Sequence, residues 1–186
     1  GSGVPVGLRV HGDHRMFSGA AEPDWVFDCR GTGAKADWPQ VRGVRGEVIR
    51  LHAPQVHIRR PVRLMHPRYP LYIAPKPDQV YVIGATEIES DDTSPASVRS
   101  TLELLSAAYS LHSGFAEARI LEINTQLRPA LNNNLPGIRQ SSPRMLQING
   151  LYRHGFLIAP AMLDAVLGWI NGDTTLAERF QLMQKA

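Results

Sequence analysis

The sequence feature that most constrains the fold is a strand–turn–helix pattern near the C-terminus. Residues 145–148 are typical of a buried strand, and the segment after them has glycines at positions 150 and 155. An apolar run then leads to Pro160, where we expect a helix to begin. Glycine lets a backbone approach a ligand closely, and a helix N-terminus presents free N–H donors. The pattern therefore indicates either a binding loop that carries Arg153 or an ordinary turn with that arginine exposed.

The rest of the chain alternates between strand-like and helix-like periodicity, which predicts an α+β fold. Strand-like segments lie at 4–10, 25–27, 46–51, 71–74, 80–84 and 119–127. A turn-forming sequence joins 71–74 to 80–84, so we expect these two to form an antiparallel pair. Helices are expected at 94–111, 160–170 and 175–183. In the first of these, the helical period places four apolar residues on one face: Val98, Leu102, Leu105 and Tyr109.

The composition is that of a globular chain, with 43% hydrophobic residues, 20% charged residues and a net charge of +3. No run of about 18 apolar residues is present, so we expect no membrane span. A single cysteine, Cys29, excludes an intrachain disulfide and fits a small buried residue in a cytoplasmic protein. The arginines at 59, 60, 63 and 68 are too dispersed to predict a nucleic-acid partner. His11 and His14 lack a third ligand at the spacing of a metal site.

The segment Gly31–Ala36 has the glycine spacing of a dinucleotide-binding fingerprint, directly after a predicted strand. A working fingerprint opens a helix whose N-terminus binds the pyrophosphate. Here the residues Asp37, Trp38 and Pro39 stop such a helix almost at once. We therefore expect a tight turn at this segment and no pyrophosphate site.

Three segments together carry a family resemblance. They are LYIAP at 71–75 with VIGATE at 82–87, LRPALNNNLP at 127–136, and NGLYRHGFLIAPA at 149–161. In these segments the chain resembles the glycine oxidase and D-amino-acid oxidase family of flavoproteins, and the glycine oxidases of thiamine biosynthesis in particular. The resemblance covers residues 4–170 but only about the C-terminal half of a family member, whose fingerprint would precede this chain. Asn133, Leu151 and His154 stand where the family pattern has Asp, His and Asn.

The resemblance implies a site for a small amino-acid substrate. Arg128 takes the place of the family's principal clamp for the substrate carboxylate, and Arg153 would assist it. A guanidinium suits this role because its planar fork donates two parallel hydrogen bonds. Tyr72 and Glu87 would border the same substrate. The residues alone leave other roles open: an ion pair with Glu122 for Arg128, sheet packing for Tyr72, and a surface position for Glu87.

The cofactor that the resemblance implies is FAD. Its contacts are expected at the glycine turn after the first predicted strand and at the loop before the C-terminal helix: Gly31, Gly33, Gly150, Gly155, Phe156 and Leu157. We expect no protein acid–base residue and no metal ligand, because the cofactor carries the redox chemistry. Without a fingerprint region, the chain by itself is expected to bind FAD weakly and to be inactive.

By the same resemblance, the whole enzyme oxidises glycine or a similar amino acid with O₂ and yields the imine or 2-oxo acid, ammonia and hydrogen peroxide. Other possibilities stay open. The substrate could be sarcosine, D-proline or another D-amino acid, or the chain could be a non-catalytic domain. A homo-oligomer is also open. The implied fold is α+β and D-amino-acid oxidase-like. Its expected parts are late strands of a Rossmann-like FAD domain at 1–45, a mostly antiparallel substrate-binding sheet with a helix at 46–127, and a return to the FAD domain with C-terminal helices at 128–186.

Overall fold

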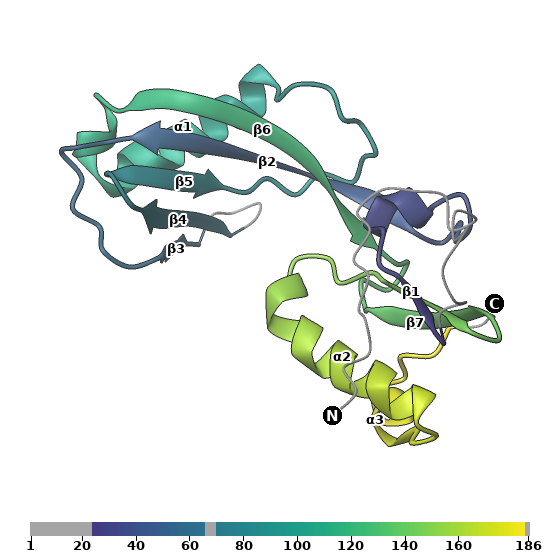
Figure 1. Ribbon diagram of the computed structural model, residues 1–186. Coiled ribbons are helices and arrows are strands. Elements are labelled where there is room, and N and C mark those ends of the chain that lie inside the picture. The colour runs from purple at the N-terminus through teal and green to yellow at the C-terminus, as the bar shows by residue number, and fades with distance from the viewer. Residues whose placement is uncertain (1–23, 66–69, 185–186) are drawn as a thin grey trace, which may run out of the picture.

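The computed structural model describes residues 24–65 and 70–184. The strand expected at 4–10, together with His11 and His14, lies outside the described residues. Two sheets make up the fold, and the long strands β2 (Arg42–His52) and β6 (Arg119–Ala130) connect them (Figure 1). Within the described part of the chain, no helix is both long and apolar enough to cross a membrane.

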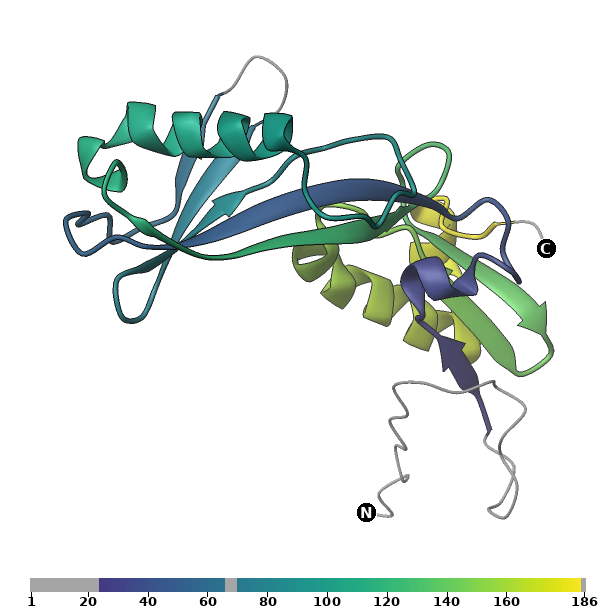
Figure 2. The ribbon, with the colours of Figure 1, turned by 90° about the horizontal axis from the view of Figure 1, so that it is seen from above.

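The larger sheet has five antiparallel strands in the order β3-β4-β5-β2-β6. Its shorter strands are β3 (Val62–Leu64), β4 (Leu71–Lys76) and β5 (Val80–Gly84). The helix α1 (Val98–Leu111) covers one face of this sheet, where it packs against β2, β4 and β5, and a short 3-10 helix, Ser113–Phe115, follows it (Figure 2). The core between sheet and helix is formed by large apolar side chains that include Ile49, Leu51, Ile73, Ile83 and Leu104.

The smaller sheet has the order β1-β8-β7. β1 (Val26–Asp28) pairs in parallel with β8 (Met145–Asn149), whereas β7 (Gly137–Ser142) pairs with β8 in antiparallel fashion. The helices α2 (Gly155–Ile170) and α3 (Thr175–Arg179) follow this sheet in the chain, and side chains from α2 share its buried core. The expectation of an α+β fold is confirmed, as is the antiparallel pair of β4 and β5. The division of the chain at 45/46 and 127/128 stays a prediction; β2 and β6 run across those positions.

The first helix differs from its prediction in its start and in its buried face. It begins at Val98, because the Ser97 hydroxyl accepts a 3.1 Å hydrogen bond from the Ser100 N–H, while Ser94 is hydrogen-bonded to Asp92 instead. Most of the expected apolar face is exposed: Val98, Leu102 and Tyr109. The buried residues are Ser100, Leu104, Ala107 and Ala108. Small residues on this face let the helix approach the sheet closely. Close packing against the sheet therefore decides which face is buried, and the face with the larger apolar side chains stays exposed.

Three further expectations about local structure are wrong. The helix α2 begins at Gly155, five residues before Pro160, so this proline lies inside the helix and does not start it. The helix α3 ends at Arg179 and does not reach 183. Cys29 is exposed at the end of β1 and not buried.

Candidate functional site

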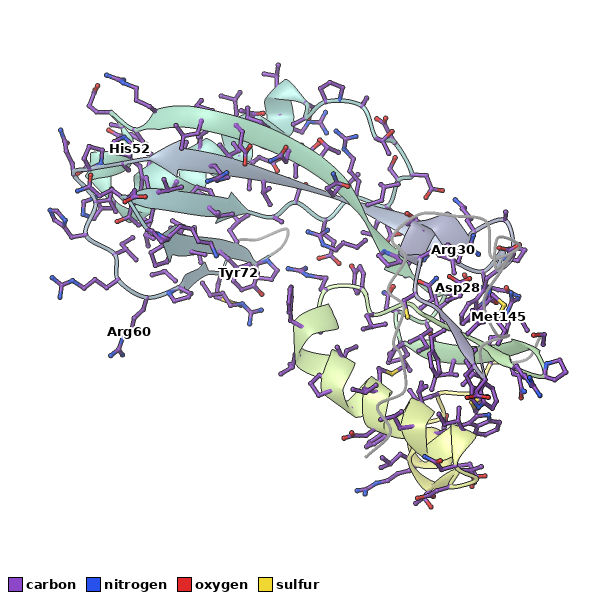
Figure 3. All side chains as sticks on the ribbon, viewed as in Figure 1. Asp28, Arg30, His52, Arg60, Tyr72 and Met145 are labelled. Atoms are coloured by element: carbon purple, nitrogen blue, oxygen red, sulfur yellow. The ribbon has the colours of Figure 1, made fainter. Side chains whose placement is uncertain are left out.

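A pocket of about 260 Å³ opens where the larger sheet meets the loop that precedes α2. Its lining comes from four strands, from the residues after β5 and from that loop: Val48, Tyr72, Ala74, Val82, Gly84, Ala85, Arg128 and Arg153. Tyr72 is labelled on β4 in Figure 3, at the side of the sheet that faces the start of α2. The pocket therefore combines apolar walls with two guanidinium groups, and it brings together three of the four residues that the sequence proposed for substrate.

Arg128 is held on β6 opposite Val44 of β2. Its Nη1 donates to the Thr86 carbonyl at 3.1 Å and to the Arg45 carbonyl at 3.5 Å. The guanidinium lies directly over Gly46, since a Cβ at that position would be 2.4 Å from Nη2. Burial, and then the positive charge of Arg153, lower the pKa of Arg128.

Among the described residues, no carboxylate pairs with Arg128. Glu122, the partner considered for it, forms an ion pair with Arg50 at 2.9 Å instead. The alternative that Arg128 forms a structural ion pair with Glu122 is therefore wrong. The structure shows a partly buried guanidinium whose described hydrogen-bond partners are two backbone carbonyls, so no carboxylate contacts its positive charge.

Arg153 has a different environment, because its Nη1 donates to Oε2 of Glu87. The other carboxylate oxygen of Glu87 accepts a hydrogen bond from the Tyr152 hydroxyl. Burial, and then the hydrogen bond and charge of Glu87, raise the pKa of Tyr152 to about 12, so this phenol stays protonated over the physiological range. Glu87 is thus neither a free surface residue nor part of the pocket lining. It holds Arg153 in place from outside the lining.

Tyr72 lies beside the pocket with part of its ring exposed. On the neighbouring strand, the Arg63 guanidinium is 5.7 Å from the centre of this ring, opposite Tyr72 in the strand register. The tyrosine therefore takes part in sheet packing and borders the pocket at the same time.

The glycines assigned to cofactor binding have different local roles. Gly31 and Gly33 form a four-residue 3-10 helix, Gly31–Ala34, which confirms a tight turn in place of a fingerprint helix. The Gly31 carbonyl accepts a 2.9 Å hydrogen bond from Asn149, which ties this turn to the end of β8. Gly150 has a φ of +77°, and a Cβ there would lie 2.8 Å from Leu131, so packing alone already requires glycine.

The start of α2 presents an unusual surface. Its first residue is Gly155, and the next two side chains, Phe156 and Leu157, are 105% and 79% exposed. The N–H groups of Leu157 and Ile158 donate to the His154 carbonyl at 2.9 and 3.0 Å, whereas no described backbone acceptor faces those of Gly155 and Phe156. An exposed apolar surface is therefore placed next to free hydrogen-bond donors.

Sequence reasoning missed three residues that shape the site: Gly46, Thr86 and Tyr152. Thr86 is fully buried, and its hydroxyl accepts a 2.9 Å hydrogen bond from the Glu47 N–H while its carbonyl binds Arg128. Gly46 is the first residue of the predicted strand 46–51 but lies inside β2, where a glycine signals close approach by another group. No group of three histidines, cysteines or carboxylates within the described ranges is placed to hold a metal ion.

Comparison with known proteins places these features in a family. The family model for FAD dependent oxidoreductases matches residues 3–165. Over 143 residues the chain is 50% identical to the putative thiamine biosynthesis oxidoreductase ThiO of Rhizobium etli, which covers 77% of this chain and 43% of that protein. It is 29% identical over 106 residues to a D-amino acid oxidase of Dugesia ryukyuensis, covering 56% of this chain and 30% of that protein.

Solved structures share the same fold. Glycine oxidase from Bacillus cereus matches with a TM-score of 0.67 and 23% identity, over 80% of this chain and 43% of that one. Iminodiacetate oxidase from Chelativorans matches with a TM-score of 0.71 and 22% identity, over 87% of this chain and 47% of that one. The chain therefore spans less than half the length of each of these relatives.

Proposed function

This chain belongs to the family of FAD-dependent oxidoreductases, and we propose that the whole protein oxidises glycine or a similarly small amino acid. The proposed products are the imine or 2-oxo acid, ammonia and hydrogen peroxide, with O₂ as the oxidant. The name of the 50% identical relative supports a place in thiamine biosynthesis as part of the same proposal.

The observation that carries this proposal is the uncompensated guanidinium of Arg128 in a small pocket with apolar walls. A partly buried positive charge without an anionic partner loses some of its solvation, and a ligand that supplies the anion would offset that loss. A carboxylate fits the guanidinium fork, and the apolar surroundings would strengthen the hydrogen bonds between the two groups. A volume of about 260 Å³ suits an amino acid with a short side chain or none.

FAD, the cofactor of the family, fits the residues at the start of α2. The N–H groups of Gly155 and Phe156, which have no described backbone acceptor, suit the electronegative edge of a flavin ring, and the exposed side chains of Phe156 and Leu157 suit its apolar faces. We propose that Gly155, Phe156 and Leu157 contact the ring system, with the Gly150 turn and the Gly31–Ala34 segment supporting them. When bound, FAD supplies the two-electron oxidation.

The residues of the chain bind and orient the substrate. Arg128 would fix the carboxylate, which sets the direction of the α-carbon and contributes proximity. Val48, Ala74 and Val82 would exclude water from the reacting end. Among the described lining residues there is no carboxylate and no imidazole, so the amine is proposed to enter in its deprotonated form.

The proposal is tested by measuring peroxide release from the FAD-loaded whole protein with glycine, sarcosine, D-proline and D-alanine. We expect activity with glycine or sarcosine and a fall in kcat/KM as the side chain grows. Higher activity with D-proline would favour the D-amino-acid alternative. Release of no peroxide from any of these amines by a flavin-loaded protein would contradict the proposal and favour a non-catalytic role.

A further inference from the structure

The two guanidinium groups of the pocket differ in charge balance. Arg128 donates to the backbone carbonyls of Thr86 and Arg45, so its charge is not neutralised by a described residue. Arg153 lines the same pocket but is paired with the Glu87 carboxylate. The pocket and its immediate support therefore carry two positive charges and one negative charge, which leaves a balance of one positive charge.

We propose that Glu87 determines specificity: by neutralising Arg153, it restricts the pocket to amino acids with a single carboxylate and disfavours dicarboxylate amines. This inference rests on the proposed role of Arg128 as the carboxylate clamp. It goes beyond that role because it assigns the number of carboxylates that the site accepts to a residue outside the pocket lining.

The contacts of Glu87 make this neutralisation firm. Its side chain is 29% exposed and that of Arg153 is 15% exposed, so water screens the pair only in part. Both carboxylate oxygens are occupied, one by Arg153 and the other by the Tyr152 hydroxyl. A second substrate carboxylate would have to replace Glu87 at Arg153, which would bring two like charges together and leave Glu87 with the Tyr152 hydroxyl alone.

The test compares glycine with iminodiacetate, which is glycine carrying one further carboxymethyl group. Dissociation constants are measured by following the arginine Nε–H signals of the ¹⁵N-arginine-labelled chain. The variant Glu87→Gln keeps the size of the side chain and one acceptor oxygen but removes the charge. We expect the affinity for iminodiacetate relative to glycine to rise by roughly tenfold or more, because Arg153 becomes available to a second carboxylate.

Two further variants serve as controls. Glu122→Gln removes an equal charge from the pair with Arg50 on β2 and β6, away from the pocket lining, and should leave the preference unchanged. The double variant Glu87→Gln with Arg153→Gln restores the net charge of the pocket, so it should return the preference to that of the wild type. Thermal melting of each variant reports whether it is folded, and the double variant keeps the test informative if Glu87→Gln alone is unstable.

The outcomes separate this inference from the proposed function. If the wild type binds glycine and Arg128→Lys weakens that binding, but Glu87→Gln leaves the preference unchanged, Glu87 does not determine specificity and the inference is overturned. The same holds if Glu122→Gln shifts the preference as much as Glu87→Gln does. If the wild type binds neither ligand, or binds both independently of Arg128, the role of Arg128 fails and the inference fails with it.

Discussion

Replacing Gly46 by alanine should displace the Arg128 guanidinium without disturbing the strand beneath it. A Cβ at position 46 would lie 2.4 Å from Nη2 and 2.5 Å from Cζ and Nη1 of Arg128, whereas ordinary contacts are 3.4–4 Å. The guanidinium must therefore retreat by about 1 Å. Because the obstructing atoms are the end of a flexible side chain, β2 itself has no need to shift.

A displacement of this size keeps the charge of Arg128 but removes the geometry of its fork. A hydrogen bond to a charged group contributes about 1.5–3 kcal/mol, so the affinity for glycine should fall by roughly 10- to 100-fold. The melting temperature should change little, because exchanging glycine for alanine inside a strand alters stability by less than about 1 kcal/mol. The expected signature is a binding defect in a fully folded chain.

The assay is a glycine titration of the ¹⁵N-arginine-labelled chain as wild type, Gly46→Ala, Arg128→Ala and the double variant, with a thermal melt of each. Since Gly46 acts through Arg128, adding Gly46→Ala to Arg128→Ala should cause no further loss of affinity. An unchanged affinity in the single variant, or losses that add in the double variant, would refute the reasoning that the missing side chain at Gly46 determines where the Arg128 guanidinium lies.

Three other perturbations follow from the same structure. Arg153→Ala should weaken glycine binding less than Arg128→Ala does, because Arg153 is already neutralised by Glu87, and a titration that ranks them in the opposite order would contradict this. At Asp28, burial alone would raise the pKa, but hydrogen bonds from Arg30 and Gln147 outweigh it and lower the pKa from 3.8 to about 2. Because the pKa of Asp28 is lower in the folded than in the unfolded chain, its ionised carboxylate stabilises the fold at pH values above the unfolded pKa. About 2 kcal/mol of the free energy of unfolding should therefore be lost as pH falls from 4 towards 2. In urea unfolding, Asp28→Asn should abolish this dependence of stability on pH. Finally, equilibrium dialysis of the chain with FAD should give weak binding or none, and a submicromolar dissociation constant would contradict the expectation that this chain alone holds FAD weakly.

Local signals in the sequence predicted those parts of the fold in which the conformation that the residues favour is also the one that tertiary packing requires. The turn between β4 and β5 and the glycine-containing loop before α2 both follow from residues that favour a sharp change of direction. The face of α1 could not be predicted in the same way, because the contact with the sheet selects small residues such as Ala107 and Ala108 and leaves larger apolar residues exposed. Helix periodicity reports which residues share a face but not which of two faces meets the core.

Residues that the sequence proposed for the candidate site lie together in the structure, but the contacts that hold them in place were not predicted. Arg128 was identified from a resemblance in sequence, and the structure places it in the same pocket as Arg153 and Tyr72. The pairing of Arg153 with Glu87 joins residues 66 positions apart, and no local pattern fixes such a contact. The role of Gly46 depends equally on the register of β2 and β6, in which Val44 lies opposite Arg128. Contacts set by strand register become visible only once the sheet is assembled.

The central claim is that Arg128 binds the carboxylate of a small amino-acid substrate. Its most direct test is kcat/KM of the FAD-loaded whole protein with Arg128→Lys, for glycine and for methylamine supplied at high concentration. Lysine keeps the charge and loses the fork, so we expect kcat/KM for glycine to fall by roughly 10- to 100-fold while the low rate with methylamine stays unchanged. Equal losses for both amines, or an unchanged rate with glycine, would contradict the claim and assign Arg128 a structural role.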